Sequence, residues 1–199
     1  MVIEKIKQTI DRENLIENKD KILVALSGGP DSVCLLHALK KLETYYNIKI
    51  YAAHLNHKIR GMEAQKDALY AAKLCDELGI QFFVKAVDVP AFAKEMKMTL
   101  EEAARQIRYN MLFEVKSKIS ADKIAVAHNL DEQAETVLMR LIGGTGITGL
   151  KGMDYKREDG VIRPLMDTKK AKIVSYCEAN NLKPRIDHTN LEIEYTRNK

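Results

Sequence analysis

The chain has 199 residues, of which 46% are hydrophobic and 30% are charged, and its formal net charge is +4. This length is enough for one substantial domain. No apolar run approaches the roughly 18 residues of a membrane-spanning helix, and the N-terminus lacks a signal-peptide core, so we expect no membrane partner. The mild positive charge permits nucleic-acid binding without requiring it.

Helical and strand patterns alternate along the chain. An amphipathic helix with Ile3, Ile6 and Ile10 on one face opens it. Strands are then predicted over 22–26, 48–55, 81–87 and 123–127, and helices over 32–45, 62–78, 99–118 and 131–142. A short extended piece over 160–165, a helix over 169–181 and a further extended piece over 183–187 follow. This alternation predicts an α/β fold with a doubly wound, mostly parallel sheet and helices on both faces.

Two helix starts carry capping signals. Thr99 is followed three residues later by Glu102, which is the spacing of a capping box. Asp167 or Thr168 is the predicted cap of the helix over 169–181. In a doubly wound sheet the ligand lies beyond the carboxyl ends of the strands. The candidate functional residues are therefore those that follow the predicted strands.

The most informative segment follows the first strand and reads Ser27-Gly28-Gly29-Pro30-Asp31-Ser32. Two glycines let the backbone approach an anion, and the first N–H groups of the next helix point toward it. The segment lacks the lysine of a Walker A loop and the third glycine of a dinucleotide fingerprint. It matches the pyrophosphate-binding loop of the N-type ATP pyrophosphatases, although an ordinary strand-to-helix turn remains the alternative.

A second polar cluster, with His54, Asn56, His57 and Arg60, follows the second strand. His54, Asn56 and Arg60 are candidates for contacts with a base, a ribose or a substrate. Two histidines three residues apart could instead bind a metal, but a third ligand is lacking. A polar connection that solvates the strand end is the remaining interpretation.

A third cluster begins at the end of the fourth strand with His128 and enters a helix. Asp131 and Glu135 are four residues apart, and Glu132 and Glu135 are three apart, so their carboxylates can share one helix face. They could hold Mg²⁺ or attract a cationic substrate, and His128 could bind a nucleotide or an oxyanion. Acidic residues in a first helical turn also stabilise the helix dipole without any ligand.

Two further segments admit both a structural and a functional reading. Arg105 and Arg108 lie one helical step apart, where they either clamp a phosphate or remain solvated. The glycine-rich segment 143–152 is either a surface linker or a loop that closes over the site.

The three cysteines, Cys34, Cys75 and Cys177, are widely spaced and form no C-x-x-C pair. Neither a zinc site nor a redox pair is predicted. All three lie in apolar helical patterns, where buried free thiols are the usual state. A reducing, cytoplasmic location fits this usage of cysteine.

Taken together, the segments resemble the tRNA(Ile)-lysidine synthases, a branch of the N-type ATP pyrophosphatases within the PP-loop superfamily. The resemblance includes the Ser27–Ser32 loop and continues in family order along most of the chain. Its other elements are His54-x-x-His57 with Arg60, Glu101-x-x-x-Arg105-x-x-Arg108-Tyr109, His128-x-x-Asp131-x-Gln133-Ala134-Glu135-Thr136, the glycines from 144 to 152, and Ile162-Arg163-Pro164-Leu165. The family usually has two aspartates where this chain has Asp131-Glu132, which leaves open the carboxylate that contacts the ligand.

The resemblance implies an adenine nucleotide α-hydrolase-like, Rossmann-like fold and a two-step reaction on an isoleucine tRNA with the anticodon CAU. The carbonyl oxygen at carbon 2 of the wobble cytidine attacks the α-phosphate of ATP, and pyrophosphate leaves. The ε-amine of free L-lysine then displaces AMP, which gives lysidine. The products besides lysidine are AMP and pyrophosphate.

The resemblance also implies roles for individual residues. ATP is bound by six loop residues and by His54; the loop residues are Ser27, Gly28, Gly29, Pro30, Asp31 and Ser32. The catalytic residues are Asp31, His128 and Arg108, and Asp31 also orients Mg²⁺. Glu132 and Glu135 bind the ammonium groups of lysine.

The expected organisation is a single N-terminal ATP-pyrophosphatase domain over 1–199, in which 143–199 forms the glycine-rich loop and a C-terminal extension. The family's C-terminal RNA-binding domains are expected to be missing from this chain. A homodimer is implied because family members commonly pair. The alternatives are another PP-loop enzyme, such as a tRNA thiolase or an amidotransferase-type ligase, and a non-catalytic ATP-binding module.

Overall fold

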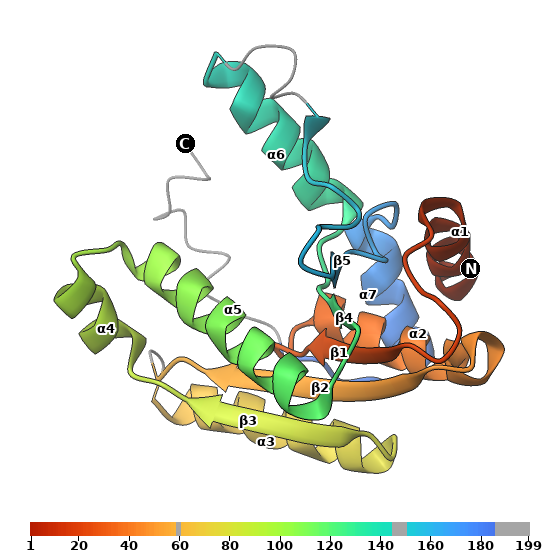
Figure 1. The fold of residues 1–199 in the computed structure, drawn as a ribbon, viewed down its shortest axis with the longest axis horizontal. Coiled ribbons are helices and arrows are strands. Elements are labelled where there is room, and N and C mark those ends of the chain that lie inside the picture. The colour runs from red at the N-terminus through yellow and green to blue at the C-terminus, as the bar shows by residue number, and fades with distance from the viewer. Residues whose placement is uncertain (59–60, 145–150, 186–199) are drawn as a thin grey trace.

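The computed structural model describes residues 1–58, 61–144 and 151–185 (Figure 1). Within these residues the strands form one five-stranded sheet with the order β3-β2-β1-β4-β5. Every neighbouring pair in this sheet is parallel, which confirms the predicted doubly wound sheet. The strands are β1 (Lys21–Ala25), β2 (Lys49–Asn56), β3 (Gln81–Ala86), β4 (Lys123–Ala125) and β5 (Val161–Ile162).

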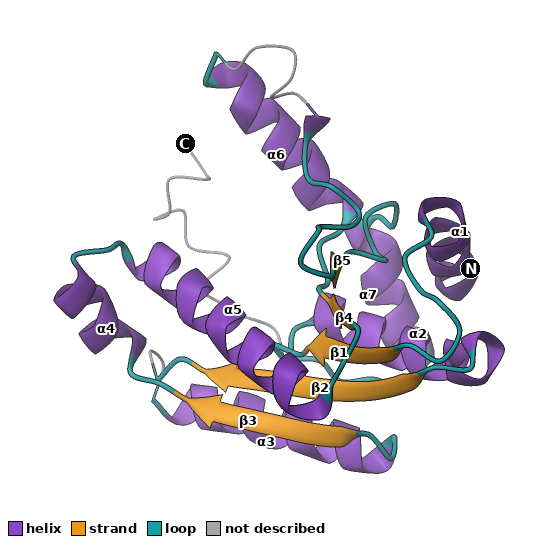
Figure 2. Ribbon diagram, in the orientation of Figure 1, coloured by secondary structure: helices purple, strands orange, loops and turns teal. Residues whose placement is uncertain are grey.

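Helices cover both faces of the sheet (Figure 2). They are α1 (Val2–Glu13), α2 (Pro30–Tyr46), α3 (Met62–Glu77), α4 (Val89–Met96), α5 (Leu100–Ile119), α6 (Leu130–Ile142) and α7 (Lys170–Ala179). One core cluster joins the sheet to α1, α2, α3 and α7, and the other joins it to α4 and α5. The short helix α4 was not predicted from the sequence.

The central strand shows why the apolar runs predicted strands correctly. Ile22, Leu23 and Val24 in β1 are completely buried, because helices pack on both sides of this strand. A parallel strand that is covered on both faces is apolar at consecutive positions. Helix α6 differs from the other helices because none of its residues is buried, and Figure 1 shows it projecting away from the sheet.

The two capping predictions had different outcomes. The capping box of α5 is confirmed, since Thr99 Oγ1 accepts a hydrogen bond from Glu102 N at 3.2 Å and Glu102 Oε2 accepts one from Thr99 N at 3.0 Å. The predicted cap of α7 was wrong: Lys169 is the N-cap, and its side chain makes no capping bond. The first N–H group of α7, at Lys170, is instead bound by Asp131 of α6 at 2.7 Å.

Asp167 acts as a junction between distant segments. Its carboxylate accepts hydrogen bonds from Thr9 at 2.9 Å, from Arg12 at 2.7 Å and from Tyr155 at 2.7 Å. Burial alone would raise the pKa of Asp167, but the bonds from Tyr155, Arg12 and Thr9 outweigh it and lower the pKa. The carboxylate therefore attaches α1 to the segment between β5 and α7.

All three cysteines are free and buried, as predicted. Among the described residues, no helix combines the length and the apolar character that are needed to cross a membrane.

Candidate functional site

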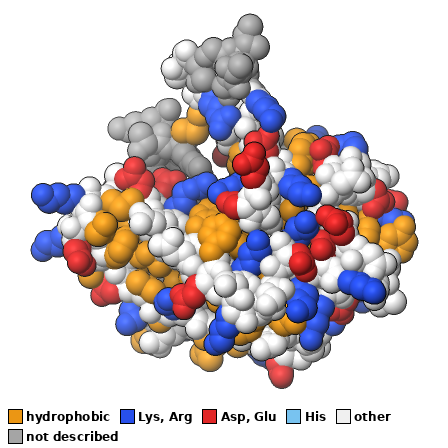
Figure 3. Space-filling view, viewed as in Figure 1, with side chains coloured by type: hydrophobic (Ala, Val, Ile, Leu, Met, Phe, Trp, Pro, Cys, Tyr) orange, Lys and Arg blue, Asp and Glu red, His pale blue; other side chains and the backbone are white. Residues whose placement is uncertain are grey.

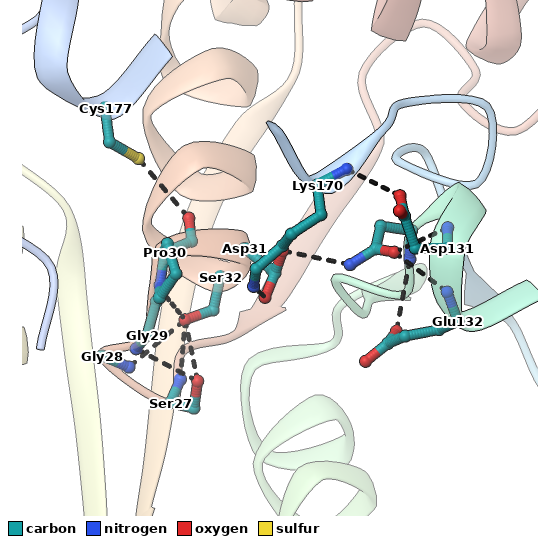
Figure 4. Close-up of polar contacts among 11 residues, drawn as sticks. Ser27, Gly28, Gly29, Pro30, Asp31, Ser32, Asp131, Glu132, Lys170 and Cys177 are labelled. Carbon is teal, nitrogen blue, oxygen red and sulfur yellow. Dashed lines mark hydrogen bonds and ion pairs between the residues drawn. The ribbon is translucent and has the colours of Figure 1, made fainter. Parts of the chain in front are cut away.

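The Ser27–Ser32 loop connects the carboxyl end of β1 to α2, and it is built around the hydroxyl group of Ser32. Ser32 Oγ accepts hydrogen bonds from the backbone N–H groups of Ser27 at 3.1 Å and Gly28 at 3.2 Å, and it donates to Gly29 O at 3.0 Å (Figure 4). Ser32 is 3% exposed, so its side chain is a fixed part of the turn. Gly29 is the N-cap of α2 and Pro30 follows it, so the dipole of α2 points its positive end at this turn.

The two glycines of the loop have different conformations. Gly28 has a φ of +93°, which side chains with a Cβ adopt only under strain. Gly29 has a φ of −74°, and a Cβ added there would lie 3.6 Å from Ser27 Oγ, an ordinary contact distance. Only the first glycine is therefore required by the backbone itself.

We expect Gly28→Ala to lower the free energy of unfolding by about 1–2 kcal/mol, the cost of a left-handed conformation for a residue with a Cβ. Gly29→Ala is the matched control, with an expected cost of about 0.5 kcal/mol from weaker N-capping. Urea denaturation of both variants measures the difference. Equal costs for the two substitutions would contradict the assigned conformations.

Asp31 lies in the first turn of α2, and both of its carboxylate oxygens are bound. Asn129 Nδ2 donates to one oxygen at 3.1 Å, and the ammonium group of Lys170 forms an ion pair with the other. Figure 4 shows Asp31, Lys170 and Asp131 close together, although they come from α2, α7 and α6. The first turns of three helices therefore meet beside the loop.

A cavity of about 590 Å³ opens next to the loop, at the carboxyl ends of β1, β2 and β4. This volume suits a nucleotide or another small molecule. The predicted residues Ser27, Asp31, Ser32, His54, Arg108, His128 and Glu132 all line it. The structure thus brings together residues that are more than 100 positions apart in the sequence.

His54 contributes a buried hydrogen-bond acceptor to this cavity. The side chain is 3% exposed, and its Nδ1–H donates to the carbonyl oxygen of Leu26 at 2.8 Å. A carbonyl can only accept, so Nδ1 carries the proton and Nε2 is an acceptor, which has no hydrogen-bond partner among the described residues. Burial lowers the pKa of His54, and the bond to Leu26 and the charge of Asp67 offset this only in part.

The other predicted residues that follow β2 are Asn56, His57 and Arg60. His57 also lines the cavity. Asn56 lines it too, but its side chain holds the local backbone, donating to Ala64 O at 3.2 Å and accepting from Lys58 N at 2.9 Å. The predicted contact from Arg60 lies outside the described residues.

The wall opposite the loop is positively charged. Arg105, Arg108 and Tyr109 of α5 line it. The guanidinium groups of Arg105 and Arg157 each lie 5.2 Å from the centre of the Tyr109 ring. In the view of Figure 3, Lys and Arg side chains lie around the middle of the molecular surface. This wall is suited to binding an anion.

Arg163 was present in the sequence motif but had no predicted role. It is 4% exposed, and its Nε donates to His128 Nδ1 at 3.3 Å. Burial is the largest influence on the pKa of Arg163 and lowers it. Tyr109 opposes this as the next largest influence, and the nearby charges of Arg157 and Arg105 lower the pKa further. A sequence pattern gives no sign that Arg163 and His128 are in contact, because the contact depends on β4 and β5 being neighbours.

The acidic residues of α6 make different contacts: Asp131 binds the backbone of another helix, whereas Glu132 lines the cavity. Asn129 Oδ1 accepts from Asp131 N at 3.0 Å and from Glu132 N at 3.1 Å, and Glu132 Oε2 accepts from Asn129 N at 3.3 Å, which forms a capping box. Asp131 binds the first N–H group of α7, whereas Glu132 lines the cavity. Glu135 is exposed one turn further along α6 and is not among the described residues that line the cavity.

The glycine-rich segment is attached to α6 at both described ends. Residues 145–150, in the middle of the segment, lie outside the described residues. After them, Met153 N donates to Gln133 Oε1 at 2.8 Å, and Gln133 Nε2 donates to Met153 O at 3.1 Å. Arg140 also donates to Gly152 O at 2.8 Å. Gly152 has a φ of +74°, and a Cβ there would lie 2.6 Å from Gln133 Nε2. Glycine is therefore required where the segment rejoins α6.

The described residues contain no group of three or more His, Cys, Asp or Glu side chains that could hold a metal ion. A metal site at His54 and His57 therefore gains no support. Magnesium often binds proteins through one or two carboxylates and takes its other ligands from substrate phosphates and water. The carboxylate of Asp31, beside the glycine-rich turn, fits this second mode.

The fold and the loop together define a class of protein: a parallel α/β domain with a glycine-rich turn and a cavity at the carboxyl end of its first strand. A family model described as a PP-loop domain matches residues 1–199. The chain belongs to this PP-loop family.

The chain is similar to curated tRNA(Ile)-lysidine synthases. It is 58% identical over 199 residues to the one from Clostridioides difficile (strain 630), covering all of this chain and 43% of that protein. It is 42% identical over 197 residues to the one from Thermosipho africanus (strain TCF52B), covering 99% of this chain and 46% of that protein. The chain thus spans less than half the length of these relatives.

Solved structures support the same fold. The U34-tRNA thiolase NcsA from Methanococcus maripaludis, solved with its [4Fe-4S] cluster, has a TM-score of 0.76 and 25% identity, covering 92% of this chain and 63% of that one. An NH3-dependent NAD synthetase from Campylobacter jejuni has a TM-score of 0.60 and 20% identity, covering 95% and 74%. The second likeness shows the fold alone.

Proposed function

We propose that this chain is the catalytic domain of an ATP-dependent ligase that converts the wobble cytidine of an isoleucine tRNA to lysidine. The observation that carries the proposal is the similarity, over the full length of this chain, to relatives named tRNA(Ile)-lysidine synthase. The cavity supports it, because it combines an anion-binding turn, a basic wall and a carboxylate in one space. Each of these suits one of the three substrates.

ATP binds with its phosphates at the Ser27–Ser32 loop. The positive end of the α2 dipole faces the β- and γ-phosphates. Asp31 would hold Mg²⁺, which would supply positive charge beside the leaving pyrophosphate. His54 accepts a hydrogen bond from a donor group of the nucleotide through Nε2, because its other nitrogen is already committed to Leu26.

The first chemical step transfers AMP to the cytidine. The carbonyl oxygen at carbon 2 of the base attacks the α-phosphate, and the bond between the α- and β-phosphates breaks. Arg108 and His128 line the same cavity as the loop, and they stabilise the negative charge on the α-phosphate. Arg163 positions His128 by donating to its Nδ1.

The second step replaces AMP with lysine. The ε-amine of lysine attacks carbon 2 of the activated base, and the bond from carbon 2 to the AMP oxygen breaks. Glu132, at the cavity wall, and Glu135, one turn along the same helix, bind the ammonium groups of the incoming lysine. Both carboxylates lie on α6, so they present a negative surface to a cationic amino acid.

The direct test is to incubate the protein with ATP, Mg²⁺, L-lysine and a tRNA(Ile) transcript that has the anticodon CAU. We expect lysine-dependent release of AMP and a wobble nucleoside whose mass has increased by that of lysine less water. The matched control is the same transcript with uridine at the wobble position. Release of AMP that is independent of lysine would contradict the proposal.

Sulfur transfer, the activity named for the archaeal thiolase, is less well supported by these residues. The three cysteines are all buried in the structure, on α2, α3 and α7, and form no C-x-x-C pair. If a sulfide donor is added to the assay, a thiolase would replace an oxygen of the nucleoside with sulfur and would attach no lysine. The mass of the product therefore separates the two functions. A non-catalytic ATP-binding module would bind ATP but release neither AMP nor pyrophosphate.

A further inference from the structure

The Ser27–Ser32 loop has no cation within its own sequence, and the structure brings one to it from a distant helix. The ammonium group of Lys170 forms an ion pair with Asp31, 139 positions earlier in the chain. A Walker A loop carries its phosphate-binding lysine inside the loop. Here the lysine beside the loop lies in the first turn of α7, next to the first turns of α2 and α6.

Lys170 is anchored through its backbone while its side chain stays accessible. Its N–H group donates to Asp131 at 2.7 Å, which fixes the start of α7. Its side chain is 42% exposed and that of Asp31 is 22% exposed. Ion pairs that are this open to water contribute little to stability, so the ammonium group can leave Asp31 at small cost.

A second described cation at the loop, Arg185, is held by its present partners. Arg185 N donates to Gly28 O at 2.9 Å, and its guanidinium group pairs with Asp67 at 3.1 Å and Glu63 at 2.5 Å. Two carboxylates and a backbone bond hold it against α3. Lys170, which forms one ion pair among the described residues, is thus better placed than Arg185 to change partner.

We infer that Lys170 moves from Asp31 to the β- and γ-phosphates when ATP binds, and so holds the pyrophosphate as it leaves. The inference rests on the proposed function, since it assigns a residue to the same nucleotide site. Bound Mg²⁺ would repel the ammonium group from Asp31, and the phosphates beside the loop offer it the nearest new anion. Before ATP binds, the ion pair with Asp31 thus keeps the ammonium group of Lys170 beside the phosphate site.

The test compares MgATP with AMP, since only ATP has the phosphates that Lys170 would bind. For Lys170→Gln, we expect MgATP to bind about 10- to 100-fold more weakly by calorimetry, the effect of losing one charge-assisted bond. AMP should bind as it does to the wild type. Lys170→Arg should retain most of the ATP affinity, and Lys172→Gln, which removes the same charge from an exposed position of α7, should change neither ligand.

Equal weakening of AMP and MgATP in Lys170→Gln, or no change in either, would overturn the inference. Because binding requires neither tRNA nor lysine, these results are independent of lysidine formation. A wild-type chain that binds MgATP, with an unaffected Lys170→Gln variant, rejects only the role of Lys170. A wild-type chain that binds no MgATP rejects the proposed function as well.

Discussion

Asp31→Asn is expected to reduce pyrophosphate release by roughly 10²–10³-fold, the usual effect of removing one preorganised electrostatic contact from a reaction centre. Asparagine has nearly the same shape, so the loop should keep its conformation. It lacks the negative charge that pairs with Lys170 and that is proposed to hold Mg²⁺. Pyrophosphate release in the presence of tRNA(Ile), ATP and Mg²⁺ measures the effect.

Glu4→Gln is the matched control for this substitution. Glu4 is also an acidic residue in the first turn of a helix, but it lies exposed on α1 and is not among the described residues that line the cavity. Its replacement removes the same charge from a helix N-terminus and should leave pyrophosphate release unchanged. Near-normal release from Asp31→Asn would reject the proposed role of Asp31.

Glu132→Gln is expected to raise the KM for lysine by about 10- to 100-fold, because it removes a charge-assisted bond to an ammonium group. Glutamine can still accept the hydrogen bond from Asn129 that closes the capping box of α6, so the helix should stay intact. The kcat at saturating lysine should change much less than KM. Steady-state kinetics with lysine as the varied substrate measure both constants.

Glu135→Gln provides the comparison on the same helix. Glu135 is exposed one turn beyond the cavity wall, where ion pairs are worth about 0–1 kcal/mol, so its KM should rise less than about fivefold. Lysine dependence that is unchanged in both variants would contradict the assignment of the lysine site to α6. A larger increase in KM for Glu135→Gln would place the lysine site one turn further along α6.

The order of strands and helices was predictable because local patterns determine it. The apolar run at Ile22–Val24 and the capping box at Thr99 are readable signals, and the structure confirms both. The short helix α4 was missed because its eight residues, with a proline in the first turn, contain little periodicity. The start of α7 was misplaced because its first N–H group is satisfied from another helix.

The candidate site was predicted in part. A glycine-rich turn after a buried strand indicated the phosphate site, and the polar residues after the second and fourth strands indicated its neighbours. The contact of Arg163 with His128 and the tautomer of His54 could not be predicted, because each depends on which strands become neighbours. Nor could the sequence predict that Asp131 binds the first N–H group of α7 whereas Glu132 lines the cavity.

The sequence by itself determined the α/β class, the glycine-rich loop after the first strand and the carboxyl-end location of the candidate site, because these depend on residues that are close together in the chain. Only the tertiary structure decided which charge lies beside the loop. Lys170 reaches Asp31 because α2 and α7 pack on the same face of the sheet, and the first turn of α6 meets theirs. Contacts across more than 100 residues leave no local pattern, since loop closure and packing, not spacing, bring such residues together.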